Sequence, residues 1–457
     1  MKSARFLGEE KISALLWRFS LPAIAGMLIT ALYNVVDSIF VGQGVGEIAL
    51  TAVTIAFPVM TLLMAFGMLI GIGAATMVSI RLGEKRQDEA EHILGNALSM
   101  MVILILVSTG LAIYFLDTIL VDFMGVTPEV LPYAHDFTFI ILLGSVFQHV
   151  GFGLNNVIRA QGDPRTAMAT QVLAALVNVV LNYAFVFVLP WGVRGAALAT
   201  VIAQAVAAVW VVYYFTLGPG LLKFRWCYLP LKGPIVRSIF KIGVAPFLMQ
   251  LGASAVMVVL NVRIQMYGGT TAVAAYGIVN RIMLLLLMPV IGISQGAQPI
   301  IGYNFGARQF DRVIRTLTLA TVAAVTVSFL GYLWIELFPE TIILLFNDSP
   351  GLMAVGVPGI RIYLALVPVV AYQIIATNYF QATGKPLYCI FFSLLRQILV
   401  LIPLVYILSN YYGLYGIWFA GPLSDLASAV VTGIVLCFDV KQLKKQAQEE
   451  ALYKVES

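Results

Sequence analysis

Long apolar segments dominate this chain and restrict its fold more than any other feature. A helix of about 20 apolar residues crosses the hydrocarbon core of a membrane. Hydrophobic residues make up 61% of the sequence and charged residues 11%, whereas about 25% of a soluble domain is charged. Twelve segments of suitable length follow one another, roughly at 12–41, 48–80, 90–116, 131–158, 166–189, 193–217, 235–266, 271–300, 312–338, 356–382, 387–409 and 413–438. The pattern predicts an all-α integral membrane protein with twelve transmembrane helices.

The distribution of lysine and arginine predicts the orientation of these helices. Most of the 27 basic residues lie in the N-terminal stretch, in alternate loops and in the C-terminal tail. The intervening loops carry only Arg194, Arg263 and Arg361. Because cytoplasmic loops are enriched in Lys and Arg, we expect both termini to be cytoplasmic in a multi-pass membrane protein.

The two halves of the sequence are related by an internal repeat. Matching positions recur at a nearly constant separation, namely Pro22 with Pro246, Asp37 with Asn261, 156–164 with 378–386, and 192–195 with 413–416. Two six-helix lobes related by a parallel repeat are typical of transporters with a site near the midplane. We therefore expect an N-lobe at 1–217, a cytoplasmic inter-lobe loop at 218–234, a C-lobe at 235–440 and a cytoplasmic tail at 441–457.

Asp37 stands inside the first apolar segment, far from any other charge along the chain. The nearest charged residues are Arg18 upstream and Glu47 downstream. A carboxylate at membrane depth costs roughly 2.5–3.5 kcal/mol on insertion scales, and such residues usually mark an ion or substrate pathway. Asp37 is therefore the leading candidate for a functional residue.

Polar side chains on two further helices could surround Asp37. Helical spacing of three or four residues places side chains on one face, and polar groups in lipid must face the bundle and find partners. The positions concerned are Tyr33 and Asn34 beside Asp37, Asn178, Asn182 and Gln171 on the fifth segment, and Thr200 and Gln204 on the sixth. We expect these residues to form one polar patch.

The chain resembles the multidrug and toxic compound extrusion (MATE) family over about residues 10 to 440. The resemblance is carried by the segment 32–42, the loop 159–165, the pair Asn178 and Asn182, and the segment 192–200. It looks closest to the DinF-like prokaryotic branch. The resemblance implies a multi-pass antiporter of the plasma (inner) membrane. It would export amphipathic, mostly cationic drugs and other toxic compounds, antibiotics among them, by alternating access.

The resemblance also implies which residues couple transport to a cation. The cation site of the N-lobe in the family maps onto Asp37, Asn178, Asn182 and Thr200 of this chain. Many relatives in this branch carry a second Asp where this chain has Asn182. The acid pair that another branch carries on the seventh and tenth helices is also missing here. One formal negative charge therefore remains at the expected site.

Two coupling chemistries fit this patch. In the first, burial favours the neutral form of the Asp37 carboxyl, which brings its protonation into the physiological range. In the second, the four residues Asp37, Asn178, Asn182 and Thr200 supply hard oxygen ligands for Na⁺, and would form a metal site only in that case. The sequence leaves both open, and no other cofactor is expected.

Three further charges lie inside predicted helices of the C-lobe: Asp425, Arg281 and Arg396. An ion pair between Asp425 and one of the two arginines is the simpler interpretation, because charges inside a membrane are usually paired. A substrate site or second coupling site is the alternative.

Other functions fit the sequence less well. A lipid-linked precursor flippase of the same superfamily would need arginines in its central cavity to hold pyrophosphate, and only Arg281 and Arg396 are candidates. We expect no enzymatic activity, because no cluster of His, Asp or metal ligands stands near a predicted membrane surface. The expected partners are amphipathic small molecules and the lipid bilayer, with no nucleic acid, and we expect a monomer.

Overall fold

The computed structural model describes residues 4–344, 346 and 349–456, and these residues form helices and connecting turns without a β-strand. The first three residues of the predicted N-lobe and the last residue of the predicted tail lie outside the described residues. The elements are α1 (Phe6–Glu9), α2 (Ile12–Gly44), α3 (Glu47–Gly83), α4 (Gln87–Tyr114), α5 (Leu116–Thr118), η1 (Ile119–Phe123), α6 (Leu131–Ala160), α7 (Pro164–Tyr183), η2 (Ala184–Val188), α8 (Gly192–Thr216), η3 (Trp226–Tyr228), α9 (Gly233–Gly306), α10 (Phe310–Leu337), α11 (Pro339–Leu344), α12 (Pro350–Tyr363), α13 (Val367–Ala382), α14 (Pro386–Leu394), η4 (Leu395–Leu401) and α15 (Ile402–Glu456).

The structure confirms an all-helical chain with many apolar helices, but it divides them differently from the sequence. Among the described residues, nine helices are long and apolar enough to cross a membrane, or ten if α12 and α13, which meet at a 46° bend, form one span. Two of the nine are unusually long, at 74 and 64 residues. The first contains a break in helical geometry at Gly269, and the second contains a break at Gly413. Each joins two of the segments that the sequence separates.

Backbone conformation repeats between the two halves of the chain. Residues with positive φ occur in pairs at the separation of the sequence repeat: Gly46 with Gly269, Lys85 with Arg308, Gly162 with Gly384, and Gly192 with Gly413. Glycine adopts positive φ without the steric cost that a Cβ imposes. Gly46 separates α2 from α3, and Gly192 begins α8. The breaks at Gly269 and Gly413 therefore correspond to helix boundaries in the first half.

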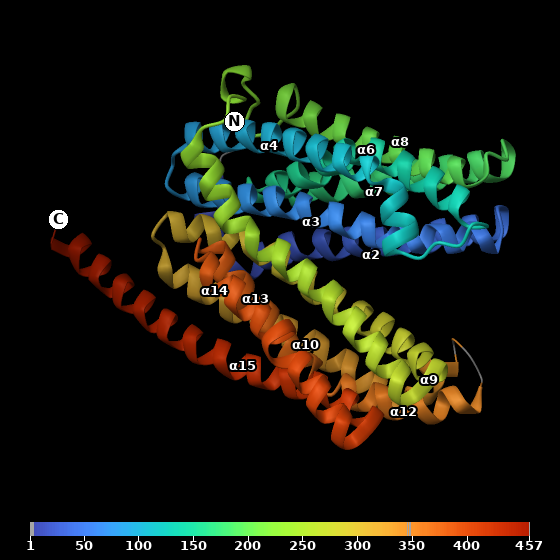
Figure 1. The fold of residues 1–457 in the computed structure, drawn as a ribbon. Coiled ribbons are helices and arrows are strands. Elements are labelled where there is room, and N and C mark those ends of the chain that lie inside the picture. Colours follow the sequence, from blue (N-terminus) through green and yellow to red (C-terminus); the bar gives the residue numbers. More distant parts are fainter. Residues whose placement is uncertain (1–3, 345, 347–348, 457) are drawn as a thin grey trace. The chain divides into compact units, whose positions relative to one another are not determined.

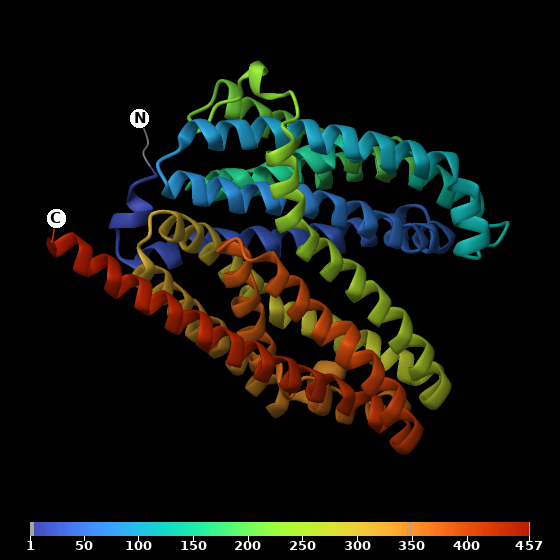
Figure 2. The ribbon, with the colours of Figure 1, turned by 60° about the vertical axis from the view of Figure 1, so that its left-hand side comes forward.

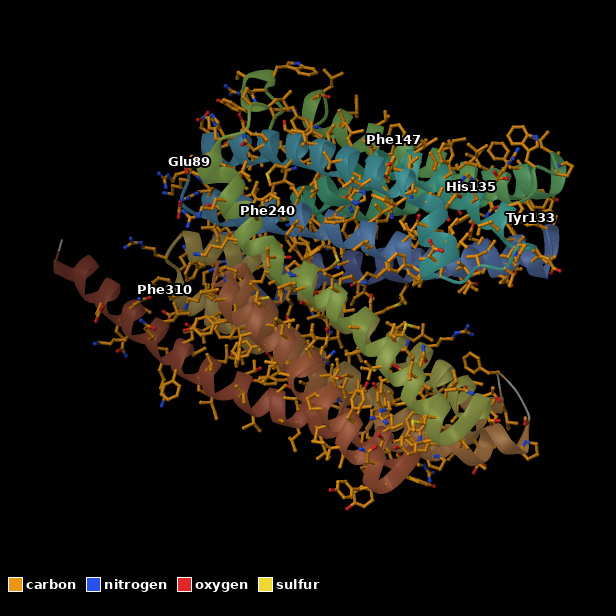
Figure 3. All side chains as sticks on the ribbon, in the orientation of Figure 1. Glu89, Tyr133, His135, Phe147, Phe240 and Phe310 are labelled. Carbon is orange, nitrogen blue, oxygen red and sulfur yellow. The ribbon has the colours of Figure 1, made fainter. Side chains whose placement is uncertain are left out.

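The chain forms two compact units, and the first consists of Met1–Phe6 and Ala25–Phe247. Helices α3, α4, α6, α7 and α8 pack against one another in this unit (Figure 1). Glycines allow the closest approaches, since a Cβ on Gly71 would lie 2.7 Å from the Cα of Gly153. Glu89 at the start of α4 and Tyr133 at the start of α6 lie at opposite ends of the bundle (Figure 3), so these two helices run in opposite directions.

The segment 217–232, which connects α8 to α9, is bound to the first unit by hydrogen bonds. The Asn96 side chain on α4 donates to the carbonyl oxygens of Tyr228 at 3.0 Å and Pro230 at 3.3 Å, and its Oδ1 accepts from the Lys232 amide at 2.7 Å. Arg225 forms an ion pair with Glu91 at 2.9 Å. The predicted inter-lobe loop is therefore held against α4.

The second unit consists of Leu7–Ile24 and Leu248–Ser457. Helices α10, α13 and α15 pack together in this unit (Figure 2). The first half of α2 belongs to the same unit. There the backbone of Ser20 lies close to Gly296, and a Cβ on Gly296 would be 2.7 Å from the Ser20 nitrogen. The Asn304 side chain donates to the Leu7 carbonyl oxygen at 3.0 Å. The boundary between the two compact units thus lies within α2, between residues 24 and 25, and within α9, between residues 247 and 248.

Candidate functional site

The second half of α2 carries Asp37 and packs against α7 and η2 in the first unit. The Phe40 ring lies edge to face with the rings of Tyr183, at a centroid distance of 6.1 Å, and Phe187, at 5.5 Å. A Cβ on Gly44 would lie 2.2 Å from a methyl carbon of Val186, so the two elements are in close contact one turn further on. This packing fixes the face of α2 that carries Asp37 toward α7.

Asp37 and Asn182 form a direct hydrogen bond between α2 and α7. The Nδ2 of Asn182 donates to the Oδ1 of Asp37. One turn earlier on α7, the Nδ2 of Asn178 donates to the Oγ1 of Thr200 on α8 at 3.2 Å. The Thr200 hydroxyl in turn donates to the Ala196 carbonyl oxygen at 3.1 Å. Three helices therefore meet through the four residues that the sequence analysis singled out.

Amide oxygens at this site are left without donors. The Oδ1 atoms of Asn178 and Asn182 and the Oε1 of Gln204 are buried, and they accept no hydrogen bond within the described part of the chain. Asn178 is 2% exposed and Asn182 is fully buried. Buried polar atoms are normally paired, and an unpaired one calls for an explanation such as an unseen ion. Oxygen acceptors beside a carboxylate are the ligands that hard cations prefer.

The remaining polar positions of the predicted patch differ in their surroundings. Tyr33 is partly buried and lies within electrostatic range of Asp37. The Gln171 side chain lies against Gly26 of α2, because a Cβ on Gly26 would be 1.9 Å from the Gln171 Oε1. Asn34 is exposed, one position from the face that carries Tyr33 and Asp37. The structure therefore brings Tyr33 to the site and leaves Asn34 on the outside of α2.

A π-helical turn follows the two asparagines on α7. Residues Ala184–Val188 form η2, directly after the end of α7 at Tyr183. Such turns are rare and frequently occur at functional sites, because the extra residue changes the direction of side chains. The repeat-related helix of the second half contains η4, which includes Arg396. Sequence periodicity gave no signal for either turn.

In the second unit, Arg396 and Asp425 form an ion pair. The nitrogen–oxygen distance is 3.6 Å, and the side chains are 22% and 13% exposed. The Ser424 hydroxyl donates to the Arg396 carbonyl oxygen at 2.7 Å, which joins η4 to α15 beside the pair. Arg281 on α9 is exposed. Of the two arginines considered from sequence, the structure pairs Arg396 with Asp425.

An aromatic cluster that the sequence did not indicate adjoins this ion pair through Tyr363. Tyr363 lies within electrostatic range of both Asp425 and Arg396. Its ring stands edge to face with those of Tyr276 and Trp418, each at a centroid distance of 6.1 Å. The three residues come from α12, α9 and α15, so only the fold reveals the cluster.

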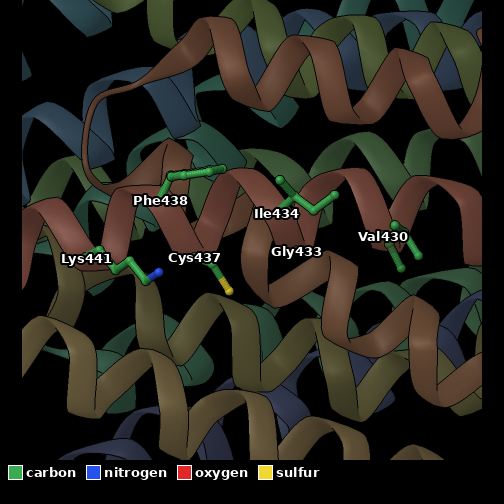
Figure 4. Close-up of a pocket in the computed structure, with 7 residues that line it drawn as sticks. Val430, Gly433, Ile434, Cys437, Phe438 and Lys441 are labelled. Carbon is green, nitrogen blue, oxygen red and sulfur yellow. The ribbon is translucent and has the colours of Figure 1, made fainter.

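An apolar groove follows the outer face of α15 in the second unit (Figure 4). Its lining residues are Ala429, Val430, Gly433, Ile434, Cys437, Phe438 and Lys441. Lys441 is the one charged side chain among them. Within the described residues, no group of three or more His, Cys, Asp or Glu side chains could hold a metal ion. This groove therefore lacks the carboxylates and amides that are present at the Asp37 site.

Comparison with known sequences finds relatives that are named multidrug export proteins. Multidrug export protein MepA of Staphylococcus haemolyticus is 26% identical over 442 residues, covering 96% of each chain. MepA of Staphylococcus aureus strain MRSA252 is 25% identical over 439 residues, covering 94% of this chain and 95% of its own. Both relatives therefore share nearly the full length of the chain.

Solved structures show the same fold. A MOP superfamily transporter from Pyrococcus furiosus superposes with a TM-score of 0.91 at 23% identity, covering 97% of this chain and 99% of its own. A MATE transporter in its bent conformation gives 0.92 at 24% identity, with 98% and 99% covered. The described helices thus have the MATE transporter fold, in a multi-pass membrane protein.

The family assignment rests on the sequence model of MatE. This model matches the chain twice, at residues 22–184 and 246–407, which together make up more than half of its length. The two matches begin at the repeat-related prolines Pro22 and Pro246, so each half carries its own copy. The chain belongs to the MatE family.

Proposed function

We propose that this protein is a cation-coupled antiporter that exports amphipathic, mostly cationic drugs, and that Asp37 binds the coupling ion. Its relatives are named multidrug export proteins. The observation that carries the proposal is the arrangement around Asp37, where a carboxylate on an apolar helix accepts from Asn182 while two asparagine oxygens nearby remain unpaired.

The arrangement suits alternate binding of a cation and release of substrate. With the ion absent, Asp37 is charged and draws α2 toward α7 through Asn182. With H⁺ bound, the carboxylate loses its charge, and this attraction weakens. With Na⁺ bound, Asp37, Asn178, Asn182 and Thr200 supply the oxygens. In both cases ion entry changes the packing of α2, α7 and α8. Each unit charge that moves inward gains about 2.3 kcal/mol per 100 mV of membrane potential.

The proposal includes twelve spans in two six-helix lobes, at 1–217 and 235–440, with both termini cytoplasmic in the inner membrane of a monomer. The breaks at Gly269 and Gly413 support twelve spans, because they repeat the breaks at Gly46 and Gly192. The basic loops support the orientation.

The flippase alternative has less support. Its pyrophosphate group would need unpaired arginines, but Arg396 is paired with Asp425. Of the two candidate arginines, only Arg281 is then left.

Dye uptake into inside-out vesicles tests the proposal, because a protein that exports from the cytoplasmic side carries dye into such vesicles. Ethidium transport is measured under an imposed gradient of H⁺ or of Na⁺ for the wild type and for Asp37→Asn. Asp117→Asn serves as the control, because the Asp117 side chain is 83% exposed. We expect one gradient to drive transport in the wild type and the control, and neither gradient to drive it in Asp37→Asn. Coupled transport by Asp37→Asn would refute the role of Asp37.

A further inference from the structure

His149 is a buried titratable residue that the coupling site does not use. It lies within α6 in the first unit and is 3% exposed. The sequence contains three histidines, and their spacing indicated no ligand cluster. The position of the His149 ring gives it a role that spacing could not reveal.

Both ring nitrogens of His149 face backbone carbonyl oxygens. The Nδ1 atom lies 2.7 Å from the Ser145 oxygen, one turn earlier on α6. The Nε2 atom lies 2.5 Å from the Leu63 oxygen on α3. A carbonyl oxygen only accepts, and a neutral imidazole has a single N–H donor. The neutral ring can therefore satisfy one of these contacts, and the other would bring two lone pairs together.

The protonated ring satisfies both contacts, because the imidazolium carries an N–H on each nitrogen. One hydrogen bond then remains within α6, and the other joins α6 to α3. Hydrogen bonds with a charged donor are about twice as strong as neutral ones. The arrangement at His149 is thus complementary to the imidazolium rather than to either neutral tautomer.

The surrounding helices hold the ring at this position. A Cβ on Gly67 of α3 would lie 3.1 Å from the Cδ2 of His149, so the glycine makes room for the ring. One turn further along α3, Gly71 meets Gly153 of α6 at backbone contact distance. Because α3 and α6 approach closely on this side, the Leu63 oxygen stays in front of Nε2.

No charged side chain among the described residues faces His149. Its interactions are with the two backbone carbonyls, and neither a carboxylate nor a cation contributes. From α4, the Thr109 hydroxyl lies 2.7 Å from the Ser145 hydroxyl. From α8, apolar residues pack against α6, among them Val201 at Gly144. The charge of the ring is therefore set by proton binding at His149 itself.

We propose that His149 is a second proton-binding site, separate from Asp37, and that the bound proton joins α6 to α3. Proton binding converts the neutral ring, with its N–H on Nδ1, to the imidazolium. Nε2 then donates to the Leu63 oxygen. Proton loss leaves the bond to Ser145 and turns the contact with Leu63 into a repulsion. The contact between α3 and α6 is consequently tighter in acid than in base.

Nitrogen NMR of histidine-labelled protein in lipid bilayers tests the proposal on the native chain. The full-length protein has three histidine rings, and the variants His92→Gln and His135→Gln assign the NMR signals of two of them. Between about pH 5 and about pH 8, where histidines titrate, we expect His149 to change from two N–H groups to one on Nδ1. A ring that keeps one protonation state throughout this range would overturn the proposal.

A thermal unfolding series provides a second readout. His149→Gln offers an amide with two N–H donors that does not titrate. Because only the wild-type ring titrates, the difference in unfolding temperature between the wild type and His149→Gln should change with pH. A difference that is the same at every pH would contradict the proposal. Asp37→Asn should leave the His149 titration intact, so this test does not depend on the coupling site.

Discussion

Replacing Asn182 with leucine separates the two coupling chemistries, because the two ions respond in opposite directions. Leucine keeps most of the side-chain volume but removes the Nδ2 donor to Asp37 and the unpaired Oδ1. A hydrogen bond to a charged group contributes about 1.5–3 kcal/mol. Asn182 is fully buried, so water cannot replace the donor. The charged carboxylate is therefore destabilised by about this amount.

The size of the expected shift follows for the proton, and its direction follows for Na⁺. About 1.4 kcal/mol corresponds to a factor of ten in an equilibrium constant, so the loss amounts to roughly 10- to 150-fold. If protons drive export, Asp37 holds its proton more tightly, and the midpoint of the pH dependence of dye efflux moves up by roughly one to two pH units. If Na⁺ drives export, the Oδ1 ligand of Asn182 is lost, Na⁺ binds more weakly, and half-maximal transport needs more Na⁺.

Dye efflux at varied pH and at varied Na⁺ concentration measures both midpoints. Asn156→Leu is the matched control, because the Asn156 side chain donates to a carbonyl of its own helix, at 3.0 Å from Phe152. We expect the control to keep the wild-type midpoints. If Asn182→Leu also keeps both, the hydrogen bond to Asp37 has no part in ion binding, and the reasoning above is wrong.

Three further predictions concern stability. Arg396→Leu should lower the unfolding free energy by about 3 kcal/mol or less, because Asp425 loses its counter-charge at a pair that is only partly buried; adding Asp425→Leu should restore it, and thermal unfolding in detergent measures both. Gly243→Ala should destabilise the protein by about 1–3 kcal/mol through overpacking, since the added Cβ would lie 1.6 Å from a backbone oxygen of α3. Gly277→Ala is the control, because a Cβ at Gly277 meets open space. Equal melting temperatures of the two variants would contradict the prediction. Asn96→Leu should free the segment 217–232 from α4, so trypsin should cleave this segment faster in the variant than in the wild type. Unchanged cleavage would show that Asn96 does not hold the segment.

Much of the coupling site could be predicted from sequence because helical spacing and membrane energetics act locally. Asp37 stands out by its charge, and the spacing of Asn178 and Asn182 places them on one face. Whether an oxygen is left unpaired depends on how three helices are rotated against one another. The sequence could not indicate this for Gln204, nor that Asn34 would be exposed.

The fold shows a similar division between local and long-range information. Hydropathy and the repeat indicated an all-helical chain with two related halves. The sequence could not assign the first half of α2 to the second unit, because that depends on contacts such as Ser20 with Gly296, far apart along the chain. Nor could it choose between Arg281 and Arg396 as the partner of Asp425. His149 was passed over because both of its acceptors are backbone atoms, which leave no trace in the sequence.

The most direct test of the central claim is to measure cation entry driven by substrate leaving. Proteoliposomes with the protein inserted so that dye leaves through it are given an outward gradient of ethidium, and internal pH and internal Na⁺ are recorded. The account predicts that one of the two ions enters with the wild type and with Asp117→Asn, and that neither enters with Asp37→Asn. Substrate-driven ion entry in Asp37→Asn at the wild-type rate would contradict it.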